Sequence, residues 1–302
     1  ITSLLSNELQ EAIDNASEGS IITLSKGEYH GNIVINKALV IDGIDKKAKI
    51  IGDGKGSVIS IKKSNVVIKN LSIENSGFSV ENVDSAIYAK EVNNITIENN
   101  HMSDSLFGIN LEQVNRSKVI DNFITSKDLE LGIRGDAIRL WNSHDNQLLS
   151  NKIYKSRDFV LWYSSGNNIE NNYGSYNRYS LHFMHAGRNM VRNNFFEYNS
   201  VGIFFMYSSG TIAIGNTVKN SLGAFGVGIG MKDSSDFTLL ENNLIYNPRG
   251  LYLDQSPYHP RTVNVFERNN ILYNSSGVQF QVSRERSIFK ENVIKGNIEP
   301  VV

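Results

Sequence analysis

The chain of 302 residues has no cysteine, only four prolines and no long apolar run. Without cysteine there are no disulfides, thiolate metal ligands or cysteine nucleophiles. No uninterrupted apolar stretch is longer than FVLWY at 159–163. This length is far short of the roughly 20 residues that a membrane helix needs. Neither sign of charge dominates, since 30 Lys and Arg face 31 Asp and Glu. The composition therefore argues against a membrane-spanning helix and against a basic nucleic-acid binder.

A short pattern of two or three apolar residues followed by x-Asn returns along the chain, and it predicts the architecture. Its spacings run from 21 to 30 residues, with a base period of about 22. Apolar residues alternate within each period, which indicates strands rather than helices. The Asn positions are Asn70, Asn100, Asn122, Asn151, Asn172, Asn194, Asn216, Asn243, Asn270 and Asn292.

These features predict an all-β, right-handed parallel β-helix. A leucine-rich repeat would need a Leu-x-Leu consensus, which is missing, and the blades of a β-propeller are about twice too long. Asn suits the corners because it tolerates left-handed backbone and because stacked Asn side chains can bond from coil to coil.

The ends of such a solenoid expose unpaired backbone groups. Residues 1–20 are expected to form an N-terminal cap, with a helix that begins near a capping box of Asn7 and Gln10 and ends before Gly19. We expect a single domain over residues 1–302. No similar cap follows Asn292, so further residues are expected to follow Val302 in the natural protein.

Aligning the coils on their Asn predicts one strand in each coil with alternating inward and outward residues. The inward column includes Trp162, Phe183 and Phe205, which we expect to stack as an aromatic ladder in the core. The outward columns are polar at both ends of the chain but apolar in the middle. The outward residues in this middle part are Trp141, Leu161, Tyr163, His182, Met184, Phe204 and Met206.

An apolar patch of this kind usually marks an interaction site. We expect Trp141, Leu161, Tyr163, Phe204 and Tyr207 to bind a partner protein. The alternative is that a loop covers the patch and turns it into a side core.

His182, Met184 and Met206 are the candidate metal ligands within the patch. Met184 and Met206 should be neighbours on adjacent coils, about 4.8 Å apart, with His182 one outward position away. Thioethers and imidazole prefer Cu(I) to hard cations, and a site without thiolate would hold copper transiently. The same residues would also serve as plain hydrophobic contacts for a partner.

We do not expect an enzyme. The dipeptide Asp-Asp occurs nowhere, and no two acidic residues share an outward position on adjacent coils, as paired catalytic carboxylates would require. The alternative function is a carbohydrate-binding protein, or a carbohydrate-active one of lyase or epimerase type, with the outer aromatics as sugar platforms.

The succession GDAIRLWNS, RDFVLWYSSG, YSLHFMHAG, VGIFFMYSSG, GIGMKDSSD and GLYLDQSP resembles the NosD family. The likeness is dense from about Asn70 to Asn292. It implies a periplasmic, non-enzymatic β-helix protein that helps to load copper into apo nitrous oxide reductase. The implied partners are the membrane and ATPase subunits of an ABC transporter and a lipid-anchored copper chaperone. By this likeness the chain is exported, and it contacts the membrane only through partners. His185 stands where the family pattern has Tyr.

Three coils are longer than the base period, with extra residues at 126–136, 220–228 and 255–264. Insertions in a solenoid gather on one face and often bind the partner. We expect removal of 255–264 to leave stability nearly intact, since a loop scarcely enters the contacts between coils. The other histidines, His30, His101, His144 and His259, are interpreted as surface residues.

Overall fold

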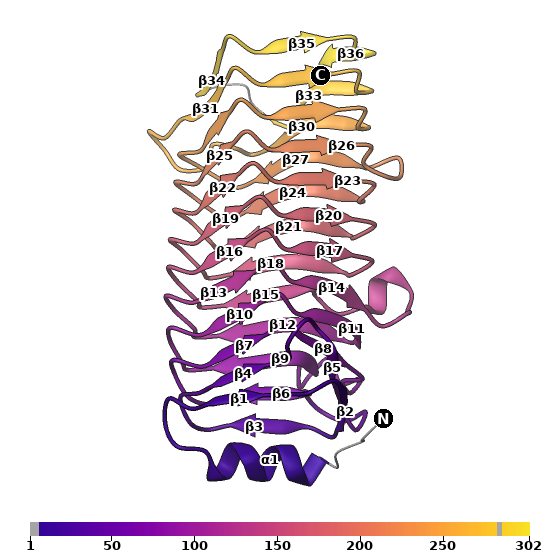
Figure 1. Ribbon diagram of the computed structural model, residues 1–302. Helices are drawn as coiled ribbons and strands as arrows, with labels where there is room; N and C mark the ends of the chain where they lie inside the picture. Colours follow the sequence, from indigo (N-terminus) through magenta and orange to yellow (C-terminus); the bar gives the residue numbers. More distant parts are fainter. Residues whose placement is uncertain (1–5, 283–285) are drawn as a thin grey trace. The chain divides into compact units, whose positions relative to one another are not determined.

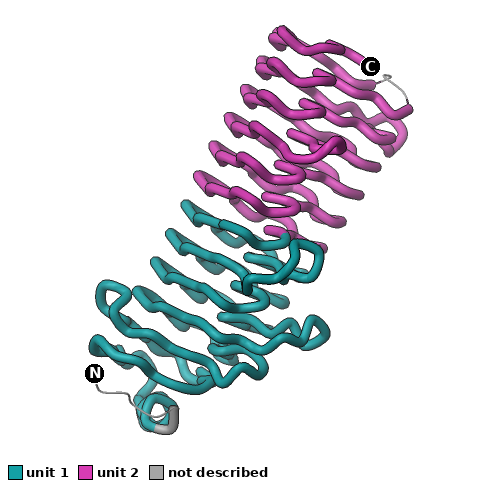
Figure 2. The backbone as a smooth tube through the Cα atoms, turned by 90° about the vertical axis from the view of Figure 1, so that its right-hand side faces the viewer, with its two compact units in different colours: residues 1–157 teal, residues 158–302 magenta. Residues whose placement is uncertain are grey.

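The computed structural model describes residues 6–282 and 286–302. The chain forms two compact units, residues 1–157 and residues 158–302 (Figure 2). In each unit the backbone winds through short strands that pair in parallel with strands of neighbouring turns, which builds three sheets (Figure 1). The expected right-handed parallel β-helix with a short N-terminal helix is confirmed. The expectation of one domain over residues 1–302 stays a prediction.

The strands of unit 1 follow each other in repeating order through the three sheets. The first sheet contains β1 (Ile21–Thr23), β4 (Val40–Asp42), β7 (Val67–Lys69), β10 (Thr96–Glu98), β13 (Lys118–Ile120) and β16 (Gln147–Leu149). The second sheet contains β2 (Gly27–His30), β5 (Ala48–Ile51), β8 (Leu71–Glu74), β11 (His101–Ser105), β14 (Phe123–Ser126) and β17 (Lys152–Tyr154). The third sheet contains β3 (Ile33–Ile35), β6 (Ile59–Ile61), β9 (Ser85–Lys90), β12 (Phe107–Glu112) and β15 (Ile138–Trp141). The 3₁₀ turn η1 (Leu131–Ile133) lies in the insertion before β15.

Unit 2 repeats the same order. Its first sheet contains β19 (Asn168–Glu170), β22 (Met190–Arg192), β25 (Ile212–Ile214), β28 (Thr238–Leu240), β31 (Asn264–Glu267) and β34 (Ser287–Lys290). Its second sheet contains β20 (Tyr173–Ser175), β23 (Phe195–Glu197), β26 (Thr217–Lys219), β29 (Asn243–Ile245), β32 (Asn270–Leu272) and β35 (Val293–Lys295). Its third sheet contains β18 (Asp158–Trp162), β21 (Tyr179–Met184), β24 (Val201–Met206), β27 (Val227–Lys232), β30 (Arg249–Asp254), β33 (Ser276–Phe280) and β36 (Glu299–Val301).

Helix α1 (Ser6–Asn15) caps the first turn, as expected. It buries Leu9 and Ile13 against the open end of the solenoid. The side-chain amide of Gln10 accepts a hydrogen bond from Val34 N–H and donates one to Val34 C=O, so it satisfies both backbone groups of an edge residue in β3. The capping role expected of Asn7 concerns a side chain outside the described residues. Within the described part of the chain, no helix is both long and apolar enough to cross a membrane.

The recurring Asn side chains form a buried hydrogen-bonded ladder inside the corner between the first and second sheets. In unit 2, Oδ1 of Asn242 accepts bonds from the backbone N–H and the Nδ2 of Asn216 at 3.0 and 2.9 Å. Nδ2 of Asn242 donates to Ala213 C=O and to Oδ1 of Asn269, at 2.9 and 3.0 Å. The ladder therefore continues through Asn242 and Asn269.

The sequence alignment is wrong by one residue at Asn243 and Asn270, which are the second Asn of an Asn-Asn pair and lie on the half-buried outer side of their strands. The residue before each ladder Asn takes the left-handed conformation, such as Glu241 at φ 55°. The corner thus needs one residue for the backbone turn and the next for the ladder.

The predicted aromatic ladder is only partly correct. Phe183 and Phe205 are fully buried and stack with ring centroids 4.8 Å apart. Trp162, however, pairs in register with Met184 and faces outward, and Leu161 pairs with Phe183 and is 0% exposed. The placement of Leu161 in the outward patch is therefore wrong.

A β-bulge explains this error. The register between β18 and β21 shifts between Asp158 and Val160, because β18 reaches the same corners with one residue fewer than β21. The spacing of 21 residues between Asn151 and Asn172 is the trace of this deletion in the sequence. Since side chains alternate at period two, one missing residue exchanges the two faces of the strand.

The corrected register makes a testable prediction for two adjacent residues. Leu161→Ala should lower the free energy of unfolding by about 2–5 kcal/mol, since it empties a fully buried site. Trp162→Ala should cost clearly less, because its side chain is only half-buried on the outer face. Urea denaturation of both variants would measure the difference. A larger loss of unfolding free energy for Trp162→Ala than for Leu161→Ala would instead support the sequence alignment, which places Trp162 in the core.

Candidate functional site

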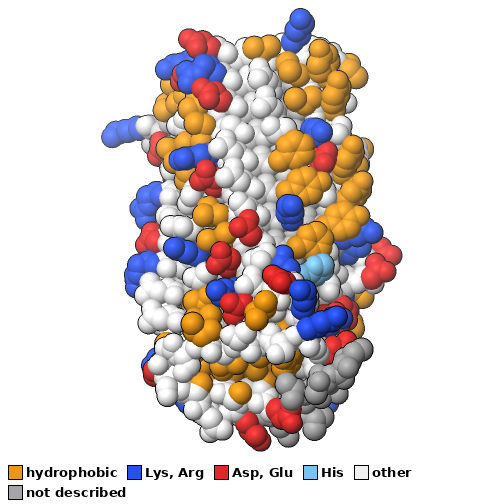
Figure 3. All heavy atoms as spheres, in the orientation of Figure 1, with side chains coloured by type: hydrophobic (Ala, Val, Ile, Leu, Met, Phe, Trp, Pro, Cys, Tyr) orange, Lys and Arg blue, Asp and Glu red, His pale blue; other side chains and the backbone are white. Residues whose placement is uncertain are grey.

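The outer face of the third sheet in unit 2 brings two predicted metal ligands together. Met184 in β21 pairs in register with Met206 in β24, which confirms that they are neighbours on adjacent turns. Both side chains are half-buried. His182 lies two residues before Met184 in the same strand and pairs with Phe204. Figure 3 shows one face of the molecule, on which hydrophobic side chains stand in columns together with basic and acidic groups.

His182 is more enclosed than an exposed surface column would allow. Its side chain is 9% exposed, and its ring stacks on Tyr179 with centroids 4.5 Å apart and planes inclined by 17°. Nδ1 lies 3.5 Å from Oδ2 of Asp158, which is too long for a well-formed hydrogen bond. Neither ring nitrogen has a hydrogen-bond partner. The imidazole is thus buried with an unused donor atom, which is costly unless the group has a ligand or a function.

Asp158 is the anchor beneath this histidine. Its carboxylate is buried and accepts hydrogen bonds from Nε and Nη2 of Arg178. It also accepts a hydrogen bond from the backbone N–H of Tyr179 at 3.3 Å. Burial alone would raise the pKa of Asp158, but His182 and Arg178 outweigh it and hold that pKa below its ordinary value. The carboxylate therefore stays charged and fixed in place.

Phe204 faces outward but is covered, at 7% exposure. Its ring meets Tyr179 edge-on at 6.0 Å and lies 6.5 Å from Tyr252. On the next turn, a Cβ at Gly230 would come within 2.3 Å of the Phe204 ring, so glycine there makes room for it. Neighbouring side chains of the same face thus cover the centre of the predicted patch.

The exposed part of the predicted patch lies at the corner after the sheet. Tyr163 and Tyr207 are 44% and 43% exposed, and each stacks on His185, with centroids 5.2 and 4.9 Å apart. All three residues take the left-handed backbone conformation. His185 therefore continues a column of stacked aromatic rings, which explains how it can stand where the family pattern has Tyr.

Trp141 belongs to unit 1, where it is half-buried in β15. The Arg139 guanidinium lies 5.1 Å from its ring centroid. On the preceding turn, Glu112 occupies the register position of Trp141 and forms an ion pair of 2.8 Å with Lys90. This part of the outer face is therefore polar apart from Trp141.

The insertion at 255–264 is more deeply tied to the coils than expected. Ser256 is buried and accepts a hydrogen bond from Ser234 N–H. Asn264 is fully buried and begins β31, and its Oδ1 accepts a bond from Phe237 N–H. Deleting 255–264 would remove these bonds, so the expectation that it would scarcely affect stability is wrong. The middle of the insertion is tied to the coils as well, since the backbone N–H groups of Tyr258 and His259 donate to Oγ of Ser235.

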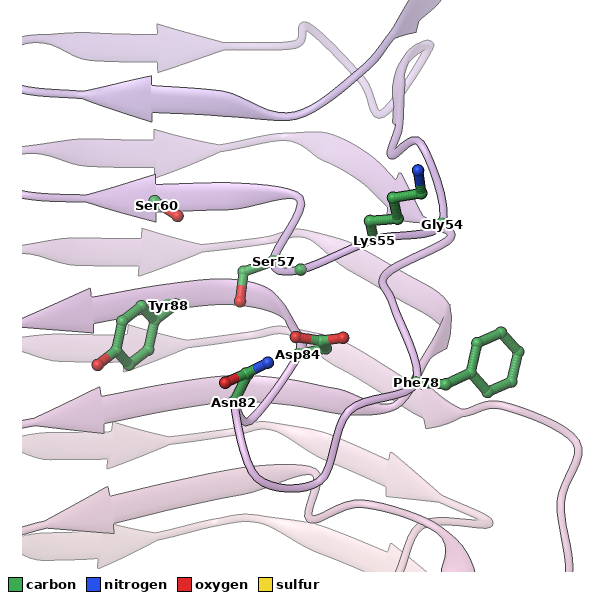
Figure 4. Close-up of a pocket in the computed structure, with 9 residues that line it drawn as sticks. Gly54, Lys55, Ser57, Ser60, Phe78, Asn82, Asp84 and Tyr88 are labelled. Atoms are coloured by element: carbon green, nitrogen blue, oxygen red, sulfur yellow. The ribbon is translucent and has the colours of Figure 1, made fainter.

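Unit 1 carries a separate hollow of about 580 Å³ between the loops at 54–57 and 78–84. Ser57, Asn82 and Asp84 converge there, whereas Phe78 points away from them (Figure 4). Ser60 and Tyr88 of the third sheet also line it. Sequence reasoning did not single out this hollow, because its residues come from two loops without a recognisable motif.

The donor set of His182, Met184 and Met206 fits a soft monovalent metal in its chemistry. The two thioethers stand side by side, and the buried Nε2 of His182 has no other partner. Imidazole nitrogen and thioether sulfur favour Cu(I). Among residues 6–282 and 286–302, no cluster of three or more His, Cys, Asp or Glu side chains could hold a metal ion.

The contacts of His182 with Asp158 and Tyr179 were missed from the sequence. Asp158 and Tyr179 are register partners at the start of adjacent strands. A corrected alignment of β18, with its bulge, would have placed the carboxylate beside the histidine strand.

The fold and this face define the class of protein: a right-handed parallel β-helix with a histidine and two methionines on one outer sheet face. The sequence profile described as "Periplasmic copper-binding protein (NosD)" matches residues 128–302, more than half of the chain. The chain belongs to the NosD family, as the resemblance of its coil motifs indicated.

Solved structures with a similar fold act on polysaccharides. The A-module of mannuronan C-5 epimerase AlgE6 from Azotobacter vinelandii superposes with a TM-score of 0.79 at 14% identity, covering 95% of this chain and 94% of that one. An alginate lyase from Paenibacillus sp. superposes with a TM-score of 0.69 at 15% identity, covering 83% and 98%. At such low identity these likenesses show the shared fold alone.

A cell surface glycoprotein of Methanothermus fervidus is 32% identical over 106 residues. This match covers 34% of the chain and 17% of the glycoprotein. The chain thus spans less than a fifth of that protein's length.

Proposed function

We propose that this protein is a periplasmic accessory protein that delivers copper during assembly of nitrous oxide reductase, without being an enzyme itself. Its family supports a copper-related accessory role in the periplasm. The observation that carries the site is the pairing of Met184 with Met206 beside His182, whose Nε2 is unused. These three residues bind Cu(I) transiently, because a site without thiolate releases its ion readily.

The proposed partners follow from the family resemblance. They are the membrane and ATPase subunits of an ABC transporter, a lipid-anchored copper chaperone and apo nitrous oxide reductase. Tyr163 and Tyr207 in unit 2 contribute a contact surface for a partner, and Trp141 in unit 1 is a separate candidate contact. Exposed stacked aromatics such as Tyr163 and Tyr207 offer large, rigid contact area at low entropic cost, which supports a docking role for that corner.

A functional assay tests this proposal. Purified wild-type protein should compete for Cu(I) with a colorimetric chelator and should raise the copper content of apo nitrous oxide reductase when chaperone and transporter are supplied. His182→Phe, which keeps a planar ring, should weaken both effects. His185→Phe is the matched control, because it changes an exposed histidine three residues away and should leave Cu(I) binding unchanged.

A carbohydrate-binding function is the second candidate. The hollow in unit 1, where Ser57, Asn82 and Asp84 converge, supports it, because such groups can bind sugar hydroxyls. The same preparation should therefore be tested for binding and cleavage of acidic polysaccharide. Polysaccharide binding or cleavage without Cu(I) competition would replace the copper proposal by this one.

A further inference from the structure

We propose that Asp158 is the positioning residue of the copper site: its carboxylate faces Nδ1 of His182, favours the N–H on that nitrogen and leaves the Nε2 lone pair free for the metal. This inference rests on the proposed copper-binding function and names a residue that the sequence did not suggest. It concerns the orientation and the tautomer of His182 in the metal-free protein.

The carboxylate of Asp158 faces one of the two nitrogens of the His182 ring. Oδ2 of Asp158 lies 3.5 Å from Nδ1 of His182, and both side chains are at least nine-tenths buried. Nδ1 is therefore the ring nitrogen that faces a negative charge. A neutral imidazole carries one N–H and one lone pair, and the N–H favours the nitrogen beside the carboxylate.

The orientation of the Asp158 carboxylate is fixed by hydrogen bonds. Arg178 donates from Nε to Oδ1 at 2.9 Å and from Nη2 to Oδ2, so the two groups form a bidentate pair. The backbone N–H of Tyr179 adds a third bond to Oδ1. The orientation of Asp158 is thus set by three donors before His182 is considered.

The plane of the His182 imidazole is fixed as well. The ring of Tyr179 stacks on His182 at 4.5 Å and limits rotation about the side-chain bonds. With the ring plane and the Nδ1 side both fixed, Nε2 remains as a buried nitrogen without a partner.

Metal-binding histidines commonly have this arrangement. The ring nitrogen that does not bind the metal donates to a carboxylate or carbonyl, which fixes the tautomer and makes the other nitrogen a better ligand. Loss of such a carboxylate typically weakens metal binding by about 10- to 100-fold. Asp158 is the buried carboxylate that faces the Nδ1 of His182, at 3.5 Å.

The tautomer can be measured without copper. Long-range ¹H–¹⁵N NMR of the metal-free wild-type protein should show the N–H of the neutral His182 ring on Nδ1 rather than on Nε2. His182→Phe removes this signal and so assigns it. A neutral ring that carries its N–H on Nε2 would overturn the inference.

The second measurement is Cu(I) competition with a colorimetric chelator. Asp158→Asn should weaken Cu(I) binding about tenfold or more and should change the His182 tautomer. Asp136→Asn is the matched control: Asp136 is also buried and ion-paired with an arginine, Arg157, at 3.0 Å, but lies in unit 1. It should cause a similar loss of stability with no effect on Cu(I) binding.

The two proposals fail differently. If the wild-type protein binds Cu(I) and Asp158→Asn binds it equally well, the role of Asp158 is wrong while the copper site stands. If the wild-type protein does not bind Cu(I), the proposed function fails, and the role of Asp158 fails with it.

Discussion

Asn242→Ala is expected to lower the free energy of unfolding by about 3–5 kcal/mol. The substitution removes the acceptor of Asn216 N–H and Nδ2 and the donor to Ala213 C=O, all inside the corner of unit 2. A buried polar group that loses its partner costs about 1–3 kcal/mol, and several are affected at once. Urea denaturation followed by circular dichroism would measure the loss.

Asn243→Ala is the control for this prediction, because the two residues are adjacent and chemically identical. Asn243 lies half-buried on the outside of β29, where it donates to Thr217 at 3.4 Å and accepts from Asn270. Its replacement should cost about 1 kcal/mol or less, as for a typical hydrogen bond near the surface. Equal losses for the two variants would contradict the assignment of the ladder.

The double substitution Met184→Leu/Met206→Leu is expected to weaken Cu(I) binding by about tenfold or more. Leucine keeps the apolar character and approximate volume of methionine but has no sulfur to bind a soft metal. Chelator competition would measure the change in affinity.

Met190→Leu is the matched control, because Met190 is also half-buried but lies in β22 of another sheet. It should leave Cu(I) binding unchanged. If the double variant binds Cu(I) as tightly as the wild type and still captures its partners, the face only docks proteins and the metal site is wrong.

Most of the fold could be predicted from the sequence because a solenoid repeats one local pattern. The recurring Asn and the alternating apolar residues define strands and corners in nearly every turn, and the N-terminal helix has its own apolar face. What the pattern could not give was the register within a turn of unusual length. In β18 the bulge after Asp158 placed Leu161 inside and Trp162 outside, contrary to the alignment.

The candidate site, too, could be predicted only where neighbouring turns have equal length. The pairing of Met184 with Met206 followed from two equal coils in succession and is confirmed. The burial of His182 could not be predicted, because it depends on a stacked Tyr179 and on a carboxylate one turn away. Such contacts arise from side-chain direction across the bulge, which residue spacing does not encode.

X-ray absorption spectroscopy of the Cu(I)-loaded wild-type protein tests the central claim most directly. The account predicts sulfur scatterers from Met184 and Met206 together with one imidazole nitrogen from His182. The sulfur contribution should disappear in Met184→Leu/Met206→Leu, and it should persist in Met190→Leu. A copper shell of nitrogen and oxygen alone in the wild-type protein would contradict the claim that this face of the β-helix binds copper through its methionines.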